Sequence, residues 1–149
     1  MATCFFIGHR EAPDGLLPTL DAEVERHITE YGMTDFVVGN YGQFDARAAK
    51  CVKAAKKRHP EVTLTLLLPY HPHDRPTPTP PSFDGTFYPL GMETVPKRAA
   101  IIQANRYMVD HSDYLIAYVW HPASNVQNLV EYAMKRKMQS LIKITVLPK

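Results

Sequence analysis

Three short segments hold most of the unusual local chemistry of this chain. They are residues 8–10, 39–45 and 120–125, and the residues singled out within them as ligand-binding are Gly8, His9, Arg10, Gly39, Asn40, Ser124 and Asn125. Glycine lets backbone N–H groups approach a phosphate closely, because no Cβ atom intervenes. The guanidinium of Arg10 can bind a phosphate or a carboxylate through two parallel hydrogen bonds. The pattern indicates a site for a phosphate-bearing molecule.

Four more residues could complete such a site. Arg98 and Asn105 are seven positions apart and would share one face of a helix. A polar pair on an otherwise apolar helix can line a crevice or satisfy the backbone of a buried loop, and both interpretations stay open. Glu93 and Glu131 are the candidate catalytic acids, since two carboxylates can cleave a glycosidic bond. That chemistry depends on their separation in space, which the sequence does not set.

Each segment also has a purely structural interpretation. The first can simply end a strand and leave its polar side chains in solvent. Gly39 and Asn40 both tolerate positive φ and can form a turn. Asp45 is expected to cap a helix, with ligand binding as the lesser alternative. Ser124 followed by Gln127 matches a capping box, although a capping hydroxyl can also face a phosphate.

Histidines and aromatic residues suggest two other kinds of site. His71, His73 and Asp74 resemble a metal-binding cluster, but they lie in a proline-rich stretch without an identifiable distant ligand. No metal site is therefore expected. Tyr70 and Trp120 could stack on a nucleobase, whereas aromatic residues at strand ends are commonly part of the core.

Five apolar segments predict strands that are buried on both faces of a sheet. They cover residues 4–7, 36–38, 63–68, 114–119 and 141–147. Apolar residues at three- and four-residue steps predict helices that follow residues 14–15, Asp45, residues 94–96 and Ser124. Residues 69–89 hold seven of the 13 prolines, so we expect a long loop there, with residues 86–88 as an edge element or part of the loop.

This alternation predicts an α/β fold, specifically a Rossmann-like three-layer sandwich with a mostly parallel sheet of five core strands in the order 3-2-1-4-5. In that order strands 2 and 3 lie on one side of strand 1, and strands 4 and 5 lie on the other side. The connections therefore lead away in opposite directions from the point between strands 1 and 4. Open α/β sheets bind ligands at such a switch point, beside the carboxyl ends of the strands. The loops after strands 1, 2 and 4 are the three segments above, so we expect them to share one crevice.

Length and composition exclude several classes of protein. The 149 residues suit a single domain, residues 1–149. A net charge of +2 does not predict a nucleic-acid or membrane partner. No apolar run approaches the roughly 20 residues needed to span a bilayer, and the N-terminus lacks the features of a signal peptide. Cys4 and Cys51 suit reduced, buried thiols, so a cytoplasmic location is expected. No cofactor is expected either.

Residues 4–10, CFFIGHR, resemble the opening of the YpsA-like branch (DUF1273) of the SLOG superfamily. The resemblance spans nearly the whole chain and continues, in order, through residues 38–40, 42–45, 68–70, 87–89, 91–93, 96, 98, 105, 112–113 and 118–119. The superfamily is Rossmann-like and includes DNA-processing proteins, cytokinin-activating phosphoribohydrolases and sensors of nucleotide-derived signals. The resemblance therefore implies a Rossmann-like fold and a nucleotide or ADP-ribose-like ligand.

The chain departs from these relatives at two places. Ser124 and Asn125 stand where relatives usually carry a Gly-Gly pair, and a side chain there restricts the approach of a phosphate. Leu90 stands where relatives tend to have an acidic residue, whereas Glu131 matches their downstream acid. The Pro-Gly-Gly-x-Gly-Thr motif of the phosphoribohydrolases is absent, which argues against that activity.

The favoured hypothesis is a sensor or ligand-binding protein for a nucleotide, ADP-ribose or NAD-like molecule, acting alone or as a homo-oligomer. The alternative is an N-glycosidic hydrolase, similar to phosphoribohydrolases, that acts on nucleoside monophosphates or ADP-ribose derivatives. Arg10, Arg98, Glu93 and Glu131 motivate this alternative. A third hypothesis, binding of single-stranded DNA, is opposed by the near-neutral charge, because phosphate backbones are bound by basic surfaces.

Overall fold

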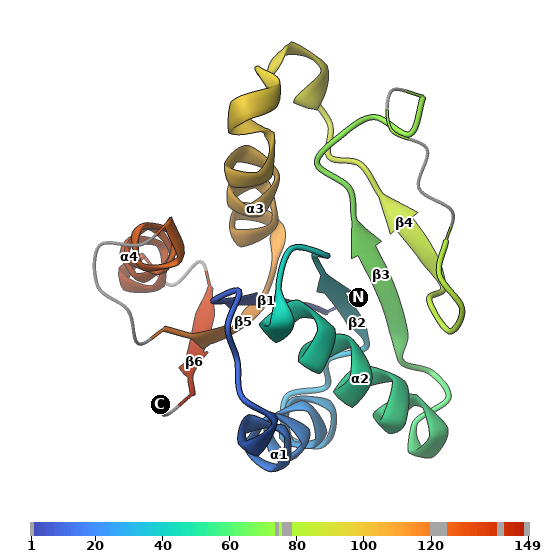
Figure 1. Cartoon of the computed structure of the whole chain (residues 1–149). Helices are drawn as coiled ribbons and strands as arrows, with labels where there is room; N and C mark the ends of the chain where they lie inside the picture. Colours follow the sequence, from blue (N-terminus) through green and yellow to red (C-terminus); the bar gives the residue numbers. More distant parts are fainter. Residues whose placement is uncertain (1, 74, 76–78, 120–124, 140–141, 148–149) are drawn as a thin grey trace.

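Strands and helices alternate along the chain (Figure 1). The computed structural model describes every residue except 1, 74, 76–78, 120–124, 140–141 and 148–149. The elements are β1 (Thr3–Gly8), α1 (Leu17–Thr29), β2 (Asp35–Val38), α2 (Gln43–Arg58), β3 (Thr63–Leu67), β4 (Gly85–Phe87), α3 (Ala100–His111), β5 (Tyr114–Tyr118), α4 (Asn125–Met138) and β6 (Lys143–Val146). Short 3-10 turns are η1 (Asp14–Leu16), η2 (Met92–Thr94) and η3 (Lys97–Ala99).

The strands form one parallel sheet in the order β4-β3-β2-β1-β5-β6. At its centre, Phe5 of β1 lies opposite Val37 of β2 on one side and Leu115 of β5 on the other. The predicted α/β sandwich is confirmed, and the five core strands have the predicted order. The chain moves outward from β1 through β2, β3 and β4, and then returns to β5 on the other side of β1. The switch point therefore lies between β1 and β5.

The sheet has one strand more than the five predicted. β4 pairs in parallel with β3, with Thr65 opposite Gly85 and Leu67 opposite Phe87. The neighbouring prolines are compatible with this strand because β4 lies at the edge and needs hydrogen-bond partners on one side only. Residues 86–88 were predicted to be either an edge element or part of the loop, and the structure shows an edge strand there.

Alternate residues of β1 enter two separate cores. Cys4 and Phe6 pack against α1 and α2, whereas Phe5 and Ile7 pack against α3 and α4. Figure 1 shows the two helix pairs on opposite faces of the sheet. β1 is therefore buried on both faces, which explains why its sequence is apolar without alternation.

Two predicted helix starts are corrected. Asp45 is not the N-cap, because α2 begins at Gln43 with Gly42 in the capping position. The helix predicted to follow residues 94–96 begins later than expected, because the 3-10 turn η3 comes directly after Pro96 and the α-helix begins at Ala100. The expected capping role of Ser124 lies outside the described residues.

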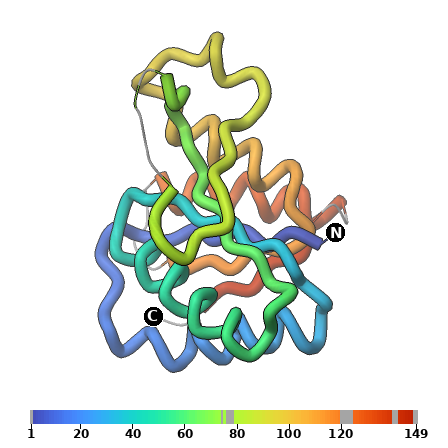
Figure 2. Tube along the Cα trace, turned by 90° about the vertical axis from the view of Figure 1, so that its right-hand side faces the viewer, coloured from blue at the N-terminus to red at the C-terminus, as the bar shows by residue number. Residues whose placement is uncertain are grey.

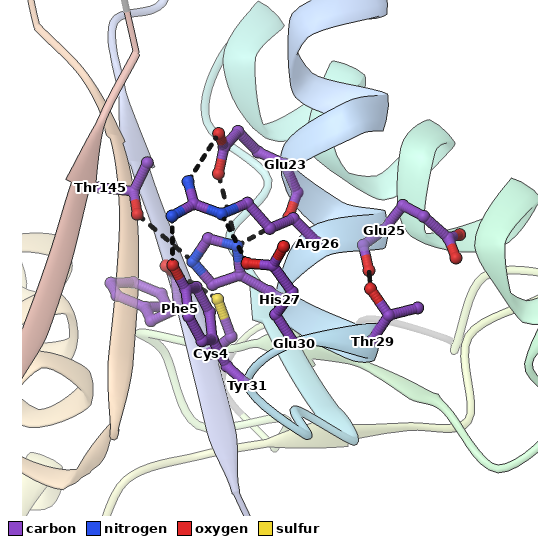
Figure 3. Close-up of polar contacts among 10 residues, drawn as sticks. All are labelled: Cys4, Phe5, Glu23, Glu25, Arg26, His27, Thr29, Glu30, Tyr31 and Thr145. Carbon is purple, nitrogen blue, oxygen red and sulfur yellow. Dashed lines mark hydrogen bonds and ion pairs between the residues drawn. The ribbon is translucent and has the colours of Figure 1, made fainter.

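The core between α1 and the sheet contains a fully buried histidine, His27 (Figure 3). Its Nδ1 atom lies 2.7 Å from the carbonyl oxygen of Glu23, and its ring meets Tyr31 and Tyr114 edge-on. Burial lowers the pKa of His27 below its usual value. The imidazole is therefore neutral, with Nδ1–H donating to the carbonyl and Nε2 facing the hydroxyl of Thr145 at 3.5 Å.

Two segments project together beyond the carboxyl ends of the strands. Figure 2 shows that the chain after β3 and the chain before α3 rise side by side above the rest of the fold. They create walls above the switch point that the sheet alone would not provide. Within the described residues, no helix has the length and apolar character to cross a membrane.

Candidate functional site

The carboxyl ends of β1, β2 and β3 meet the first turns of α3 and α4 around a cavity of about 410 Å³, here called the switch-point cavity. Its polar lining comprises His9, Arg10, Tyr41, Asp45, Arg98, Asn105 and Asn125. Apolar lining comes mainly from β1, from Leu67 and Pro69, and from the inner faces of the two helices. Such a mixed cavity is the usual form of a small-molecule site.

Seven of the nine predicted ligand-binding residues line this cavity. They come from four separate parts of the chain and are Gly8, His9, Arg10, Gly39, Arg98, Asn105 and Asn125. Asn40 is exposed and is not among the lining residues. Ser124 lies outside the described residues. The cavity therefore brings together residues from the first two of the three segments and Asn125 from the third, whose residues 120–124 lie outside the described residues.

Gly8 ends β1 directly beneath the aromatic ring of Phe44. A Cβ atom at this position would lie 2.2 Å from a ring carbon of Phe44, much closer than atoms can approach. Phe44 is fully buried and stacks on Tyr118 at a centroid distance of 5.9 Å, so its ring cannot move aside. Gly8 is thus required by packing, and the same lack of a side chain exposes backbone to the cavity.

The loop that carries Arg10 is held by the start of α2. The Arg10 carbonyl accepts a hydrogen bond from the Gln43 backbone N–H at 2.7 Å, and the Gln43 side chain accepts one from the Ala12 N–H at 2.8 Å. Gly42 allows this approach, because a Cβ atom there would lie 2.6 Å from the Cα atom of Arg10. The backbone of Arg10 is therefore fixed, while its exposed side chain stays available to a ligand.

The 3-10 turn η3 and the helix α3 that follows it contribute a second cation and an amide to the same cavity. Arg98 is exposed in η3, Asn105 is half-buried in α3, and both line the cavity together with Ile101 and Ala104. Arg98 precedes Ala100, the first residue of α3, so the two residues do not share one face of an α-helix as predicted, although both line the cavity. Arg98 and Arg10, which are far apart in the sequence, therefore both contribute to the lining of this cavity.

Asp45, for which the sequence left ligand binding as the lesser alternative to helix capping, is also a lining residue. Its carboxylate accepts a hydrogen bond from the Tyr41 backbone N–H at 3.0 Å, and it lies close to Gly39. Burial nevertheless raises the pKa of Asp45 to about 6, and the Tyr41 hydrogen bond only partly offsets that effect. Near neutral pH this carboxyl group can exchange a proton with a bound molecule, which is a property of catalytic and ligand-sensing carboxylates.

The two glutamates proposed as catalytic acids lie elsewhere. Glu93 is exposed and lines a different cavity. Glu131 is exposed on α4, where it accepts a hydrogen bond from the Gln127 amide at 3.2 Å. Neither is among the lining residues of the switch-point cavity. The structure therefore does not bring the two carboxylates together around that cavity.

Metal ligands are not grouped in the part of the chain that the structure describes. No three His, Cys, Asp or Glu side chains there are arranged to hold a metal ion. Asp74, the third member of the histidine cluster noted in the sequence, lies outside the described residues. Cys4 is fully buried, and burial raises the pKa of its thiol far above the usual range, so the thiol is not a reactive group.

The comparisons with protein-family models and with curated proteins give no match to this chain.

The position of Asp45 in the sequence could have indicated that its side chain faces the cavity. An acidic residue three positions after Gly42 can reach back from the first turn of a helix to the preceding loop, as a capping-box acid does. Such a residue faces the carboxyl end of the strand before it, where the cavity lies.

Proposed function

We propose that this protein binds a nucleotide-derived small molecule, such as a nucleotide, ADP-ribose or an NAD-like molecule, in the switch-point cavity and acts as a sensor or ligand-binding protein. The observation that carries the proposal is the convergence of Gly8, Gly39, Arg10 and Arg98 on one cavity. Exposed backbone and two guanidinium groups provide the donors that a phosphate requires.

The rest of the cavity suits the other parts of a nucleotide. Asn105 and Asn125 offer amide donors and acceptors for a base edge or a ribose hydroxyl. Ile101, Val126 and Leu129 provide an apolar wall against which a base ring can pack. The volume of about 410 Å³ is within the range of about 300–1,000 Å³ that such ligands occupy.

The resemblance to the YpsA-like branch of the SLOG superfamily supports the same ligand class and a cytoplasmic location. It places Gly8, Gly39 and Arg98 among the residues shared with that branch. Asn125, which stands at the second position of the usual glycine pair, lines the cavity here with a side chain. This favours binding without turnover, because a phosphate must sit differently from its position over two glycines.

Calorimetric titration with AMP, ADP-ribose and NAD tests the proposal. At least one of them should bind, and Arg10→Ala should weaken that binding by roughly 1.5–3 kcal/mol, the range for a charged hydrogen bond. Arg58→Ala is the matched control, because Arg58 is an exposed arginine at the far end of α2. Failure of all three nucleotides to bind, or equal effects of the two substitutions, would contradict the proposal.

A second candidate function is N-glycosidic hydrolysis, and Asp45 is the observation that favours it. A carboxyl group with a pKa of about 6 can protonate a departing base while water adds to the anomeric carbon, giving free base and ribose phosphate. Wild-type protein would then release free base over many turnovers, and Asp45→Asn would stop release while leaving nucleotide affinity nearly unchanged. Glu131→Gln serves as the comparison variant from outside the cavity.

A further inference from the structure

Asp45 brings a carboxyl group with one uncommitted oxygen to the wall of the switch-point cavity. The side chain comes from the first turn of α2 and is partly exposed. Its Oδ2 atom accepts the hydrogen bond from the Tyr41 backbone N–H at 3.0 Å. Within the part of the chain that the structure describes, Asp45 makes no other hydrogen bond and no ion pair. Because a carboxylate accepts hydrogen bonds on both oxygens, Oδ1 is available to a molecule in the cavity.

The carboxyl group lies against backbone that is proposed to bind phosphate. A Cβ atom placed on Gly39 would lie 3.0 Å from Oδ2 of Asp45 and 3.9 Å from Oδ1. An ionised carboxylate and a phosphate at contact distance would repel each other, and more strongly in a partly enclosed cavity than in water. The ligand group that meets Oδ1 must therefore be a hydrogen-bond donor that lies close to the phosphate.

The proposed wall for the base belongs to another side of the cavity. It consists of Ile101, Val126 and Leu129, which come from α3 and α4. These helices pack on the face of the sheet opposite α2, which carries Asp45 (Figure 1). In a nucleotide the ribose joins the base to the phosphate and carries hydroxyl groups. In this arrangement the ribose is the part of the ligand whose donors come closest to Asp45.

We propose that Asp45 is a specificity-determining residue of the switch-point cavity, which accepts a hydrogen bond from a ribose hydroxyl of the bound nucleotide. This rests on the proposed function and narrows it to ribonucleotides and their derivatives. A nucleotide without that hydroxyl leaves Oδ1 facing the ligand with no donor, and an acceptor deprived of water and of a partner is costly. The cavity therefore discriminates between ribonucleotides and deoxyribonucleotides.

Calorimetric titration of the wild-type protein with AMP, 2′-deoxy-AMP and 3′-deoxy-AMP tests the discrimination. The three molecules share the base and the phosphate and differ by one hydroxyl group. At least one deoxynucleotide should bind tenfold or more weakly than AMP, a loss of ~1.4 kcal/mol or more. The weaker ligand identifies the hydroxyl that meets Asp45. Equal affinities for all three nucleotides overturn the inference while the proposed function stands.

Two variants of Asp45 test whether this residue causes the discrimination. The readout is the Kd of the weaker deoxynucleotide divided by the Kd of AMP, because a general loss of affinity cancels in this ratio. Asp45→Ala removes the acceptor and should bring the ratio within twofold of one. Asp45→Asn keeps an oxygen for the Tyr41 N–H and loses the charge, so the ratio should fall at least threefold.

Glu61→Gln is the matched control. Glu61 is exposed and precedes β3, at the end of the sheet opposite the cavity, so this variant should keep the wild-type ratio. Asp45→Asn decides the test if Asp45→Ala does not fold, because asparagine preserves the hydrogen bond of the turn. The hydrolase alternative expects nearly unchanged nucleotide affinity in Asp45→Asn, so the same variant separates the two roles of Asp45.

The outcomes distinguish the inference from the proposed function. A wild-type ratio that persists in Asp45→Asn shows that another residue reads the ribose, and it overturns the inference alone. Failure of AMP to bind the wild-type protein at millimolar concentration overturns the proposed function and the inference together.

Discussion

The Asp45 carboxylate accepts a hydrogen bond from the backbone N–H of Tyr41 at 3.0 Å, across the turn that joins β2 to α2. This contact ties the wall of the switch-point cavity to a titratable group, because both residues line it. The turn therefore depends on an acceptor at position 45. Burial raises the pKa of the Asp45 carboxyl group to about 6, so its charge changes with pH near this value.

Asp45→Asn should stabilise the protein at alkaline pH. The pKa of Asp45 is about 6 in the folded protein and 3.8 in its usual state. Between these pH values the folded protein keeps a proton that the unfolded chain releases, so the free energy of unfolding of wild type decreases as pH rises. Asparagine keeps an oxygen acceptor for Tyr41 and carries no charge. We expect the free energy of unfolding of the variant to exceed that of wild type by about 2 kcal/mol at pH 8 and to match it near pH 4.

Denaturant unfolding at both pH values measures this difference. The interpretation would be wrong if the difference between the two proteins were the same at pH 4 and pH 8. A destabilised variant at pH 8 would show that the charge itself, and not only the acceptor, holds the turn.

Gly8→Ala should destabilise the fold, whether or not a ligand is present. The added methyl group meets the Phe44 ring at 2.2 Å, and overpacking of this kind costs about 1–3 kcal/mol. Gly15→Ala is the matched control, because a Cβ atom there has nothing within 4 Å. Thermal or denaturant unfolding should place the control within about 0.5 kcal/mol of wild type. Equal stability of the two variants would refute the packing role of Gly8.

His27 should make the protein less stable in mild acid. Burial lowers the pKa of His27 in the folded protein, whereas the unfolded chain titrates near 6.5. As pH falls below 6.5 the unfolded chain binds a proton that the folded protein does not bind, so stability decreases. The charged groups facing the ring are the Glu23 carboxylate and Arg26, and the Glu23 attraction is too weak to reverse the effect of burial.

His27→Phe removes the titrating group and keeps a ring between Tyr31 and Tyr114. Its free energy of unfolding should therefore fall less than that of wild type between pH 7 and pH 5. His111→Phe, which changes an exposed histidine at the end of α3, should follow the wild-type curve. Parallel curves for wild type and His27→Phe would show that His27 is not the acid-sensitive group.

Strand order was predictable because the apolar runs and helical spacings were clear. Cys4 to Ile7 is apolar without alternation, which only a strand buried on both faces explains. β4 was harder to predict, since proline and glycine surround it and its pairing with β3 is a property of the folded chain. Once the order was known, the shared crevice of Gly8 and Gly39 followed from geometry.

The polar partners of the site were predictable only in part. Helical spacing suggested that Arg98 and Asn105 line one crevice, which they do, although Arg98 lies in η3 before α3 begins. The raised pKa of Asp45, in contrast, depends on its burial in the folded protein. The exposed positions of Glu93 and Glu131 likewise depend on where η2 and α4 pack. The contact between Tyr70 and Lys97 is likewise made by the two projecting segments and not by any local pattern.

Titration of isotope-labelled protein with AMP, followed by backbone amide NMR, tests the central claim most directly. The account predicts saturable shifts at Gly8, Arg10 and Gly39, because these residues line the switch-point cavity at the carboxyl ends of two different strands, β1 and β2. The amides of Thr29 and Glu30, at the far end of α1, should not move. Saturable shifts confined to residues outside the cavity, or no shifts at millimolar AMP, would contradict the account.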